Sequence, residues 1–167
     1  GWTSGFPVSA AMDGRDALIA IGMNGEALPL MHGYPARLVV PGLYGYVSAT
    51  KWLSEINITT WSEEQGYWIP RGWSRDAPVK TQSRIDVPRQ GESIPAGKFR
   101  LAGVAWAQHT GVERVEIRID RGAWQTCDLG VDLTDDAWRQ WIFDWDATAG
   151  EHTIQVRTTD KSGYIQT

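Results

Sequence analysis

The chain has 167 residues, of which 42% are hydrophobic and 22% are charged, the composition of an ordinary globular protein with one domain or two small ones. Its formal net charge of −4, without a basic stripe, argues against a general nucleic-acid binder. Cys127 is the only cysteine, which excludes an intrachain disulfide and a metal site built from several thiolates. No segment reaches the ~20 consecutive apolar residues of a membrane span, and no signal peptide is recognisable. Because the chain opens on Gly1 without a methionine, we expect a fragment of a longer protein.

The first predicted element is a hairpin over residues 17–30. Residues 17–21 form a short apolar run, and Asn24-Gly25 is a pair typical of the type I′ hairpin turn. A buried strand is expected next at 37–40, where a Pro-Gly pair ends it.

Two further segments complete the first part of the chain. Residues 55–59 alternate and are rich in β-branched side chains, so they predict another strand, and Trp52 before them is expected in the core. Residues 61–78 contain four large aromatic rings and two prolines among glycine and serine breaks, which favours a packed functional loop over a regular element.

From residue 79 onward the pattern changes to short strands separated by turn residues. Within 115–119, valine and isoleucine alternate with glutamate and arginine, as in an antiparallel strand with one wet face. The expected strands are 79–87, 98–107, 112–120, 124–129, 138–145 and 152–159. A hairpin turn is expected at Arg121-Gly122. Strands at this spacing predict a β-sandwich of the immunoglobulin type that folds alone, with a domain boundary near residue 78.

Three cationic or proton-bearing side chains lie close together in the first part of the chain. His32 precedes a glycine, Arg37 begins the predicted 37–40 strand, and Lys51 follows a Gly/Pro-rich loop. Such groups beside a flexible loop favour an anionic ligand such as a phosphorylated cofactor. An ordinary buried strand with solvated flanking charges explains the spacing equally well.

A longer motif surrounds these residues. Residues 23–29 read Met-Asn-Gly-Glu-Ala-Leu-Pro, 32–42 read His-Gly-Tyr-Pro-Ala-Arg-Leu-Val-Val-Pro-Gly, and 51–53 read Lys-Trp-Leu. This pattern resembles the pterin-binding core of the sulfite oxidase family of molybdenum enzymes. The resemblance implies a mainly β fold, with an immunoglobulin-like dimerisation domain at 78–167. It also implies that 1–77 is the C-terminal portion of a mixed α+β molybdopterin-binding oxidoreductase domain.

The resemblance also implies roles for five residues in and directly beside the motif. His32 would donate to the pterin cofactor, and Arg37 would contact its pterin and phosphate end. Ala49, Thr50 and Lys51 would wrap the cofactor through backbone and ammonium donors. From the residues alone, a packed histidine, an interdomain ion pair for Arg37 and a snorkelling surface lysine remain open.

The aromatic loop departs from the family pattern. The family has a tyrosine beside the metal in a W-x-x-R-x-Y context, whereas residues 68–73 read Trp-Ile-Pro-Arg-Gly-Trp. Trp73 therefore stands where the tyrosine is expected, and an indole cannot supply a titrating phenol. Arg71 and Trp73 are candidates for the substrate pocket, Arg71 for an oxyanion. Either the register of the motif is shifted here by a residue or two, or substrate and proton handling differ from those of true sulfite oxidases.

The family binds molybdenum through one cysteine thiolate, which the resemblance places upstream of the first hairpin. Cys127 lies in the predicted 124–129 strand and is interpreted as a buried structural thiol. We therefore expect no metal ligand and no established catalytic residue here, no bound molybdopterin in the isolated fragment, and no turnover by it. His109 and His152, without a nucleophile or base close in sequence, are expected in turns or on the surface.

For the full-length protein, the resemblance implies oxygen-atom transfer or a related two-electron step at molybdenum. It also implies a homodimer formed through the C-terminal domain and an electron carrier such as a haem protein.

The ten tryptophans leave an alternative function open, a Trp-rich β-sandwich that binds carbohydrate or a protein partner. A third possibility is a purely structural dimer interface. Convergence of His32, Arg37 and Lys51 would favour the cofactor, and an open groove lined by tryptophans would favour the binding module.

Overall fold

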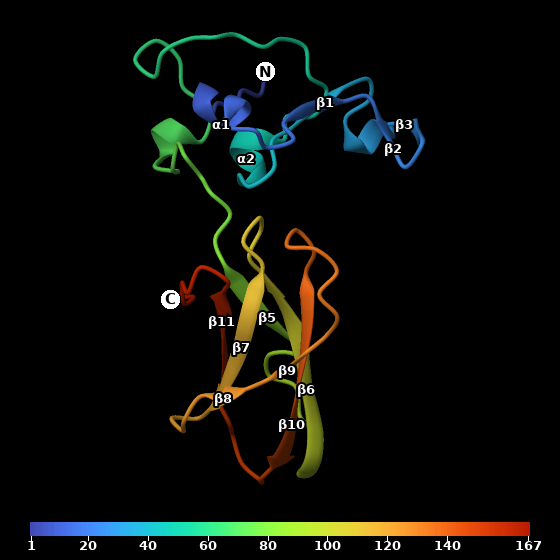
Figure 1. Cartoon of the computed structure of the whole chain (residues 1–167), viewed down its shortest axis with the longest axis vertical. Coiled ribbons are helices and arrows are strands. Elements are labelled where there is room, and N and C mark those ends of the chain that lie inside the picture. Colours follow the sequence, from blue (N-terminus) through green and yellow to red (C-terminus); the bar gives the residue numbers. More distant parts are fainter. The chain divides into compact units, whose positions relative to one another are not determined.

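The computed structural model describes residues 1–167, and the chain forms two compact units, Gly1–Val79 and Lys80–Thr167. The division lies close to the expected boundary at 77/78. Both units contain strands, and the helices are short and lie in the first unit, so the predicted mainly β fold is confirmed (Figure 1). No helix combines the length and the apolar character that crossing a membrane would require.

The first unit is built from short elements joined by long loops. In chain order they are α1 (Val8–Met12), β1 (Leu18–Ala20), β2 (Gly22–Met23), β3 (Glu26–Ala27), the 3-10 helix η1 (Leu30–His32), β4 (Arg37–Val39), α2 (Gly45–Ser48) and the 3-10 helix η2 (Ile69–Arg71). β1 pairs antiparallel with β4, and β2 pairs antiparallel with β3.

The predicted hairpin over 17–30 is correct at its turn and wrong in its pairing. Asn24 and Gly25 have φ of 54° and 81°, and a type I′ turn needs positive φ at both positions. This turn joins only β2 and β3. The apolar run of β1 pairs with β4 instead, because Pro29 and the 3-10 turn that follows it end the returning arm of the hairpin.

Two other predictions for the first unit are wrong. Residues 55–59 form no strand, and Ile56 and Ile58 are 61% and 87% exposed. An alternating pattern needs a neighbouring strand to bond with, and none lies beside this segment. Trp52 is 55% exposed rather than in the core, and its indole Nε1 donates to the carbonyl of Leu30 at 3.0 Å.

The second unit is a β-sandwich (Figure 1). Its strands are β5 (Gln82–Val87), β6 (Gly97–Trp106), β7 (Val112–Ile119), β8 (Gln125–Thr126), β9 (Asp128–Leu129), β10 (Arg139–Ala147) and β11 (Ile154–Asp160). One sheet has the order β5-β6-β10-β9 and the other the order β11-β7-β8. Lettered from A in chain order, with β8 as C′, the sheets read A-B-E-D and F-C-C′, which is compatible with the predicted immunoglobulin type.

The inner faces of the two sheets share one hydrophobic core. Leu101 and Ala105 of β6, Val115 and Ile117 of β7, and Trp141 of β10 are all at most 1% exposed. The outward residues between Val115 and Ile117 and on either side of them are charged, as the alternation predicted.

The predicted strand at 124–129 is two strands. β8 pairs with β7, β9 pairs with β10, and the segment between them passes from one sheet to the other. Cys127 lies at this crossing, 4% exposed, with its N–H donating to the carbonyl of Val115. The buried thiol was predicted correctly, and burial is the main reason why its pKa rises to about 12.

His109 lies in a turn and His152 lies in the loop before β11, and each is paired with an aspartate, whereas no nearby base was expected for either. His109 Nδ1 lies 2.9 Å from a carboxylate oxygen of Asp136. His152 Nδ1 lies 3.0 Å from Asp120, and its Nε2 lies 3.0 Å from the carbonyl of Thr148. The partners come from turns distant in sequence, which spacing could not show.

We expect His152 to make the stability of the sandwich depend on pH. Both ring nitrogens face acceptors, so the protonated ring is favoured, and the hydrogen bond with Asp120 is the main cause of the raised pKa of His152. A raised pKa stabilises the fold below the ordinary histidine pKa, and this contribution disappears as the pH rises through the raised value. Denaturant unfolding of the wild type and His152→Gln between about pH 5 and pH 9 should show a difference in unfolding free energy that shrinks with pH. A difference independent of pH would contradict this.

Candidate functional site

The predicted cofactor residues gather around one turn of the first unit. Gly33 follows η1 with φ of 112° and donates its N–H to the carbonyl of Leu30 at 3.2 Å. A Cβ at this position would lie 3.0 Å from Cβ of Lys51 and 3.1 Å from Cβ of Arg37. The glycine therefore allows Arg37 and Lys51 to approach the turn closely.

Main-chain hydrogen bonds bring Lys51 beside Arg37. The N–H groups of Leu38 and Val40 donate to the carbonyls of Thr50 and Ser48 at 2.9 and 3.1 Å. As a result, the segment that leaves α2 runs along β4, although the bonded residues are eight and twelve positions apart in sequence.

Ala49 and Thr50 lie in that segment. The N–H of Ala49 closes α2 by donating to the carbonyl of Gly45 at 3.1 Å. The hydroxyl of Thr50 lies 2.5 Å from that of Ser4. These contacts hold the segment between α2 and Lys51 in one conformation.

Three side chains donate to successive carbonyls of η1. Trp52 Nε1 donates to Leu30 at 3.0 Å, Lys51 Nζ to Met31 at 3.2 Å, and Arg37 Nη1 to His32 at 3.2 Å. Lys51 Nζ also lies 4.8 Å from the centroid of the Trp52 ring. His32 thus joins the group through its carbonyl, while its imidazole is exposed.

Arg37 carries an unused donor. Its Nε is buried and has no hydrogen-bond partner. Leaving a buried polar group unpaired costs about 1–3 kcal/mol, and more for a charged group. An anionic group at this position would satisfy Nε, and a planar guanidinium beside an ammonium suits phosphate oxygens and the polar edge of a pterin. The donor set therefore fits molybdopterin.

Arg71 and Trp73 lie in an aromatic cluster rather than beside these donors. Arg71 Nη1 donates to the carbonyl of Tyr67 at 2.6 Å, and its guanidinium carbon lies 3.8 Å from the centroid of that ring. Trp73 packs edge-on against Tyr46, with ring centroids 4.7 Å apart. Neither residue forms a hydrogen bond or ring contact with the turn at Gly33.

Tyr46 is a residue that sequence reasoning missed. It lies in α2, its hydroxyl donates to the carbonyl of Ser74 at 2.8 Å, and burial is the main reason why its pKa is raised. A phenol thus stands next to the indole of Trp73, the position at which the resemblance predicts a tyrosine. Nothing in the spacing of the residues signals this, because α2 and the aromatic loop meet only in the folded unit.

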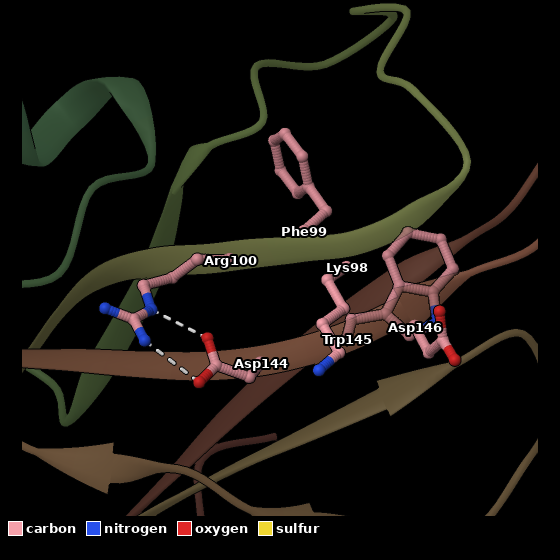
Figure 2. Close-up of a pocket in the computed structure, with 6 residues that line it drawn as sticks. All are labelled: Lys98, Phe99, Arg100, Asp144, Trp145 and Asp146. Atoms are coloured by element: carbon pink, nitrogen blue, oxygen red, sulfur yellow. Dashed lines mark hydrogen bonds and ion pairs between the residues drawn. The ribbon is translucent and has the colours of Figure 1, made fainter.

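The sandwich contains cavities, but they do not resemble a reactive site. One of about 500 Å³ lies on β6 and β10 (Figure 2). It is lined by Lys98, Phe99, Arg100, Asp144, Trp145 and Asp146. Arg100 and Asp144 satisfy each other, at 2.7 and 2.9 Å. A second cavity of about 1100 Å³ is lined by segments within 85–96 and 145–154, and Trp145 is its only tryptophan. Neither is a groove lined by several tryptophans.

No group of three or more histidine, cysteine, aspartate or glutamate side chains in the chain is arranged to hold a metal ion. The functional groups that do converge are cation and N–H donors. Such donors are chemically suited to an anionic organic group.

Comparisons with known proteins find similar sequences over most of the chain. Residues 1–68 match a family described as the oxidoreductase molybdopterin binding domain. The chain is 30% identical to human mitochondrial sulfite oxidase over 90% of its own length and 32% of that protein. It is 34% identical to the sulfite oxidase of Arabidopsis thaliana, over 64% of this chain and 31% of the relative. The chain thus spans about a third of the length of these sulfite oxidases.

A solved structure extends the similarity to both units. The similarity to the sulfane dehydrogenase SoxCD from Paracoccus pantotrophus covers 99% of this chain and 47% of the SoxCD chain. The TM-score is 0.74 and the sequence identity is 28%. The match with the family model includes His32, Arg37 and Lys51.

Proposed function

Because the chain belongs to the sulfite oxidase family of molybdopterin-binding oxidoreductases, we propose that it is the C-terminal part of a longer enzyme and forms one wall of its molybdopterin site. The observation that carries this proposal is the buried, unpaired Nε of Arg37 beside Lys51 at the Gly33 turn.

Each residue of the wall has a physical role. Arg37 offers a permanently charged planar fork to the phosphate and pterin edge, and Lys51 adds a point charge. His32 is exposed, so its ring can donate to the pterin. Ala49 and Thr50 provide main-chain groups along the path that ends at Lys51. When bound, molybdopterin supplies two-electron redox chemistry at its metal, and the residues here bind and orient it.

The remaining roles of the full-length protein follow from the same proposal. The metal ligand is a cysteine outside this chain, so the chain alone is inactive, and oxygen-atom transfer or a related step belongs to the longer protein. Relatives act, by their names, on sulfite, nitrate and sulfane, so a small inorganic sulfur or nitrogen compound is the proposed substrate class. Arg71 is the candidate for binding an oxyanion, the second unit dimerises, and a haem protein or similar carrier accepts the electrons.

Hydrogen–deuterium exchange of the full-length protein with and without bound molybdopterin tests the location of the site. We expect slower exchange within residues 30–53 when the cofactor is bound, because it covers the turn and its two flanking segments. Residues 80–167 serve as the internal control and should exchange at an unchanged rate. Protection confined to the sandwich would overturn the proposal.

A further inference from the structure

The outward face of the three-stranded sheet carries more positive than negative charge. Alternate residues of β7 are buried, so Arg114, Glu116 and Arg118 between them point outward. The neighbouring strand β11 adds Arg157, which lies opposite Glu116 in the strand register. Three arginines and one glutamate give these rows a formal charge of +2, in a chain whose formal net charge is −4.

The one glutamate in these rows is enclosed by its neighbours. The Glu116 side chain is 13% exposed, and its Oε2 lies 2.9 Å from Arg157 Nε and 3.5 Å from Arg114 Nε. One carboxylate therefore stands between two guanidiniums and compensates for only one of their charges. The uncompensated charge faces outward, because the carboxylate itself lies beneath the arginines.

A tryptophan ring lies against two of the arginines. The guanidinium carbons of Arg118 and Arg157 lie 4.7 and 4.3 Å from the centroid of the Trp124 ring, within the range of a cation–π interaction. Trp124 directly precedes β8 and is half-buried. Arginines held against a ring lose less conformational freedom when they bind a partner, so these two guanidiniums are preorganised.

Both of these guanidiniums keep N–H groups that have no hydrogen-bond acceptor. Arg118 uses Nε and Nη2 for the side-chain oxygen of Gln155, at 3.0 and 2.7 Å, which leaves Nη1. Arg157 donates through Nε alone, which leaves both Nη1 and Nη2. Fixed guanidiniums with free N–H groups suit carboxylates, which accept two parallel hydrogen bonds from one arginine.

The arginines of the other sheet are balanced instead. Arg84 and Arg100 each lie 2.7 Å from an aspartate of their own. The positive surplus on the three-stranded sheet also decides against two occupants. A second copy of the chain would bring like charges together, and the net charge of −4 disfavours a nucleic acid.

We propose that the outward face of the three-stranded sheet binds a carboxylate-rich segment of another protein. We call this surface the arginine face; it consists of Arg114, Glu116, Arg118, Trp124, Gln155 and Arg157. Tryptophan and arginine are the residues most enriched among those that dominate protein interfaces, and here they lie in contact. The inference is independent of the molybdopterin site, because the whole arginine face belongs to the second unit.

Fluorescence anisotropy of a labelled peptide made of five Glu-Ser repeats, titrated with the full chain, tests the proposal. We expect saturable binding at about 50 mM salt that weakens as the salt concentration rises. A peptide of five Gln-Ser repeats should not bind. Arg118→Gln should weaken binding of the Glu-Ser peptide by about 5- to 10-fold, and it leaves no unpaired charge because its partner Gln155 is neutral. The matched control Arg100→Gln removes an arginine from the other sheet and should bind like the wild type.

Trp124→Leu distinguishes a built site from diffuse positive charge. It leaves the net charge unchanged, so a surface acting by charge alone would keep its affinity, whereas we expect a loss of about 5-fold. Circular dichroism confirms that each variant is folded before it is titrated. Unchanged affinity in Arg118→Gln or in Trp124→Leu would overturn the proposal. Failure of the wild type to bind the Glu-Ser peptide would also overturn it, even if the chain binds vesicles of phosphatidylglycerol and phosphatidylcholine, a result that would assign the face to a lipid surface.

Discussion

Replacing Arg37 with alanine in the full-length protein is expected to weaken retention of molybdopterin by about 10- to 100-fold, the loss of a hydrogen-bonded charged group. The guanidinium is the only group at the Gly33 turn with a buried donor that lacks a partner. An interdomain ion pair, the alternative for this residue, would leave retention of the cofactor unchanged.

Pterin content of the purified variants, measured by fluorescence after oxidative release, checks this expectation. Arg37→Lys keeps the charge but loses the planar fork, so it should fall between the wild type and Arg37→Ala. Arg121→Ala removes an exposed arginine from a turn of the sandwich and should match the wild type. In the pterin-free protein, Arg37→Ala should change the unfolding free energy by no more than about 1 kcal/mol, because it also removes the unpaired Nε. Full pterin content in Arg37→Ala would rule out the assigned role.

The second large effect is expected in the sandwich, where Gly103→Ala should lower the unfolding free energy by about 3 kcal/mol. A Cβ at 103 would overlap the main-chain carbonyl oxygen of Arg84 and lie 2.6 Å from Cζ2 of Trp141. The first neighbour belongs to the paired strand β5 and the second is a fully buried ring, so neither can move away easily.

Denaturant unfolding of the full chain measures this loss. Gly130→Ala is the matched control, since a Cβ there would meet Gln140 at an ordinary 3.4 Å in the same unit. If Gly103→Ala unfolded at the same denaturant concentration as the control, β5 and β6 would be able to move apart without loss of stability. That result would contradict the close packing of the two strands around Gly103.

The strands of the sandwich and the tight turn of the first unit were predictable because their signals are local. Alternation between 115 and 119 depends only on which face of one strand is buried, and the Asn24-Gly25 turn depends only on two backbone conformations. Pairing is not local. Residues 55–59 have a suitable pattern and no neighbour, and the segment around Cys127 changes sheets because both β7 and β10 offer it a partner.

The candidate site was found through its motif, and its geometry came only from the fold. The approach of Lys51 to Arg37 depends on main-chain hydrogen bonds between β4 and the segment after α2, which no spacing reveals. The position of Tyr46 against Trp73 has the same origin. The unpaired Nε of Arg37 is also a property of packing, so the sequence could suggest a cofactor residue but not a vacant donor.

The ratio of pterin to protein in the purified full-length protein tests the central claim most directly. The protein should be produced in cells that supply molybdopterin to a second, known molybdenum enzyme, which serves as the control. We predict equimolar pterin, released only on denaturation. Absence of pterin from this protein, while the control enzyme from the same cells is loaded, would contradict the assignment of residues 30–53 as a wall of a molybdopterin site.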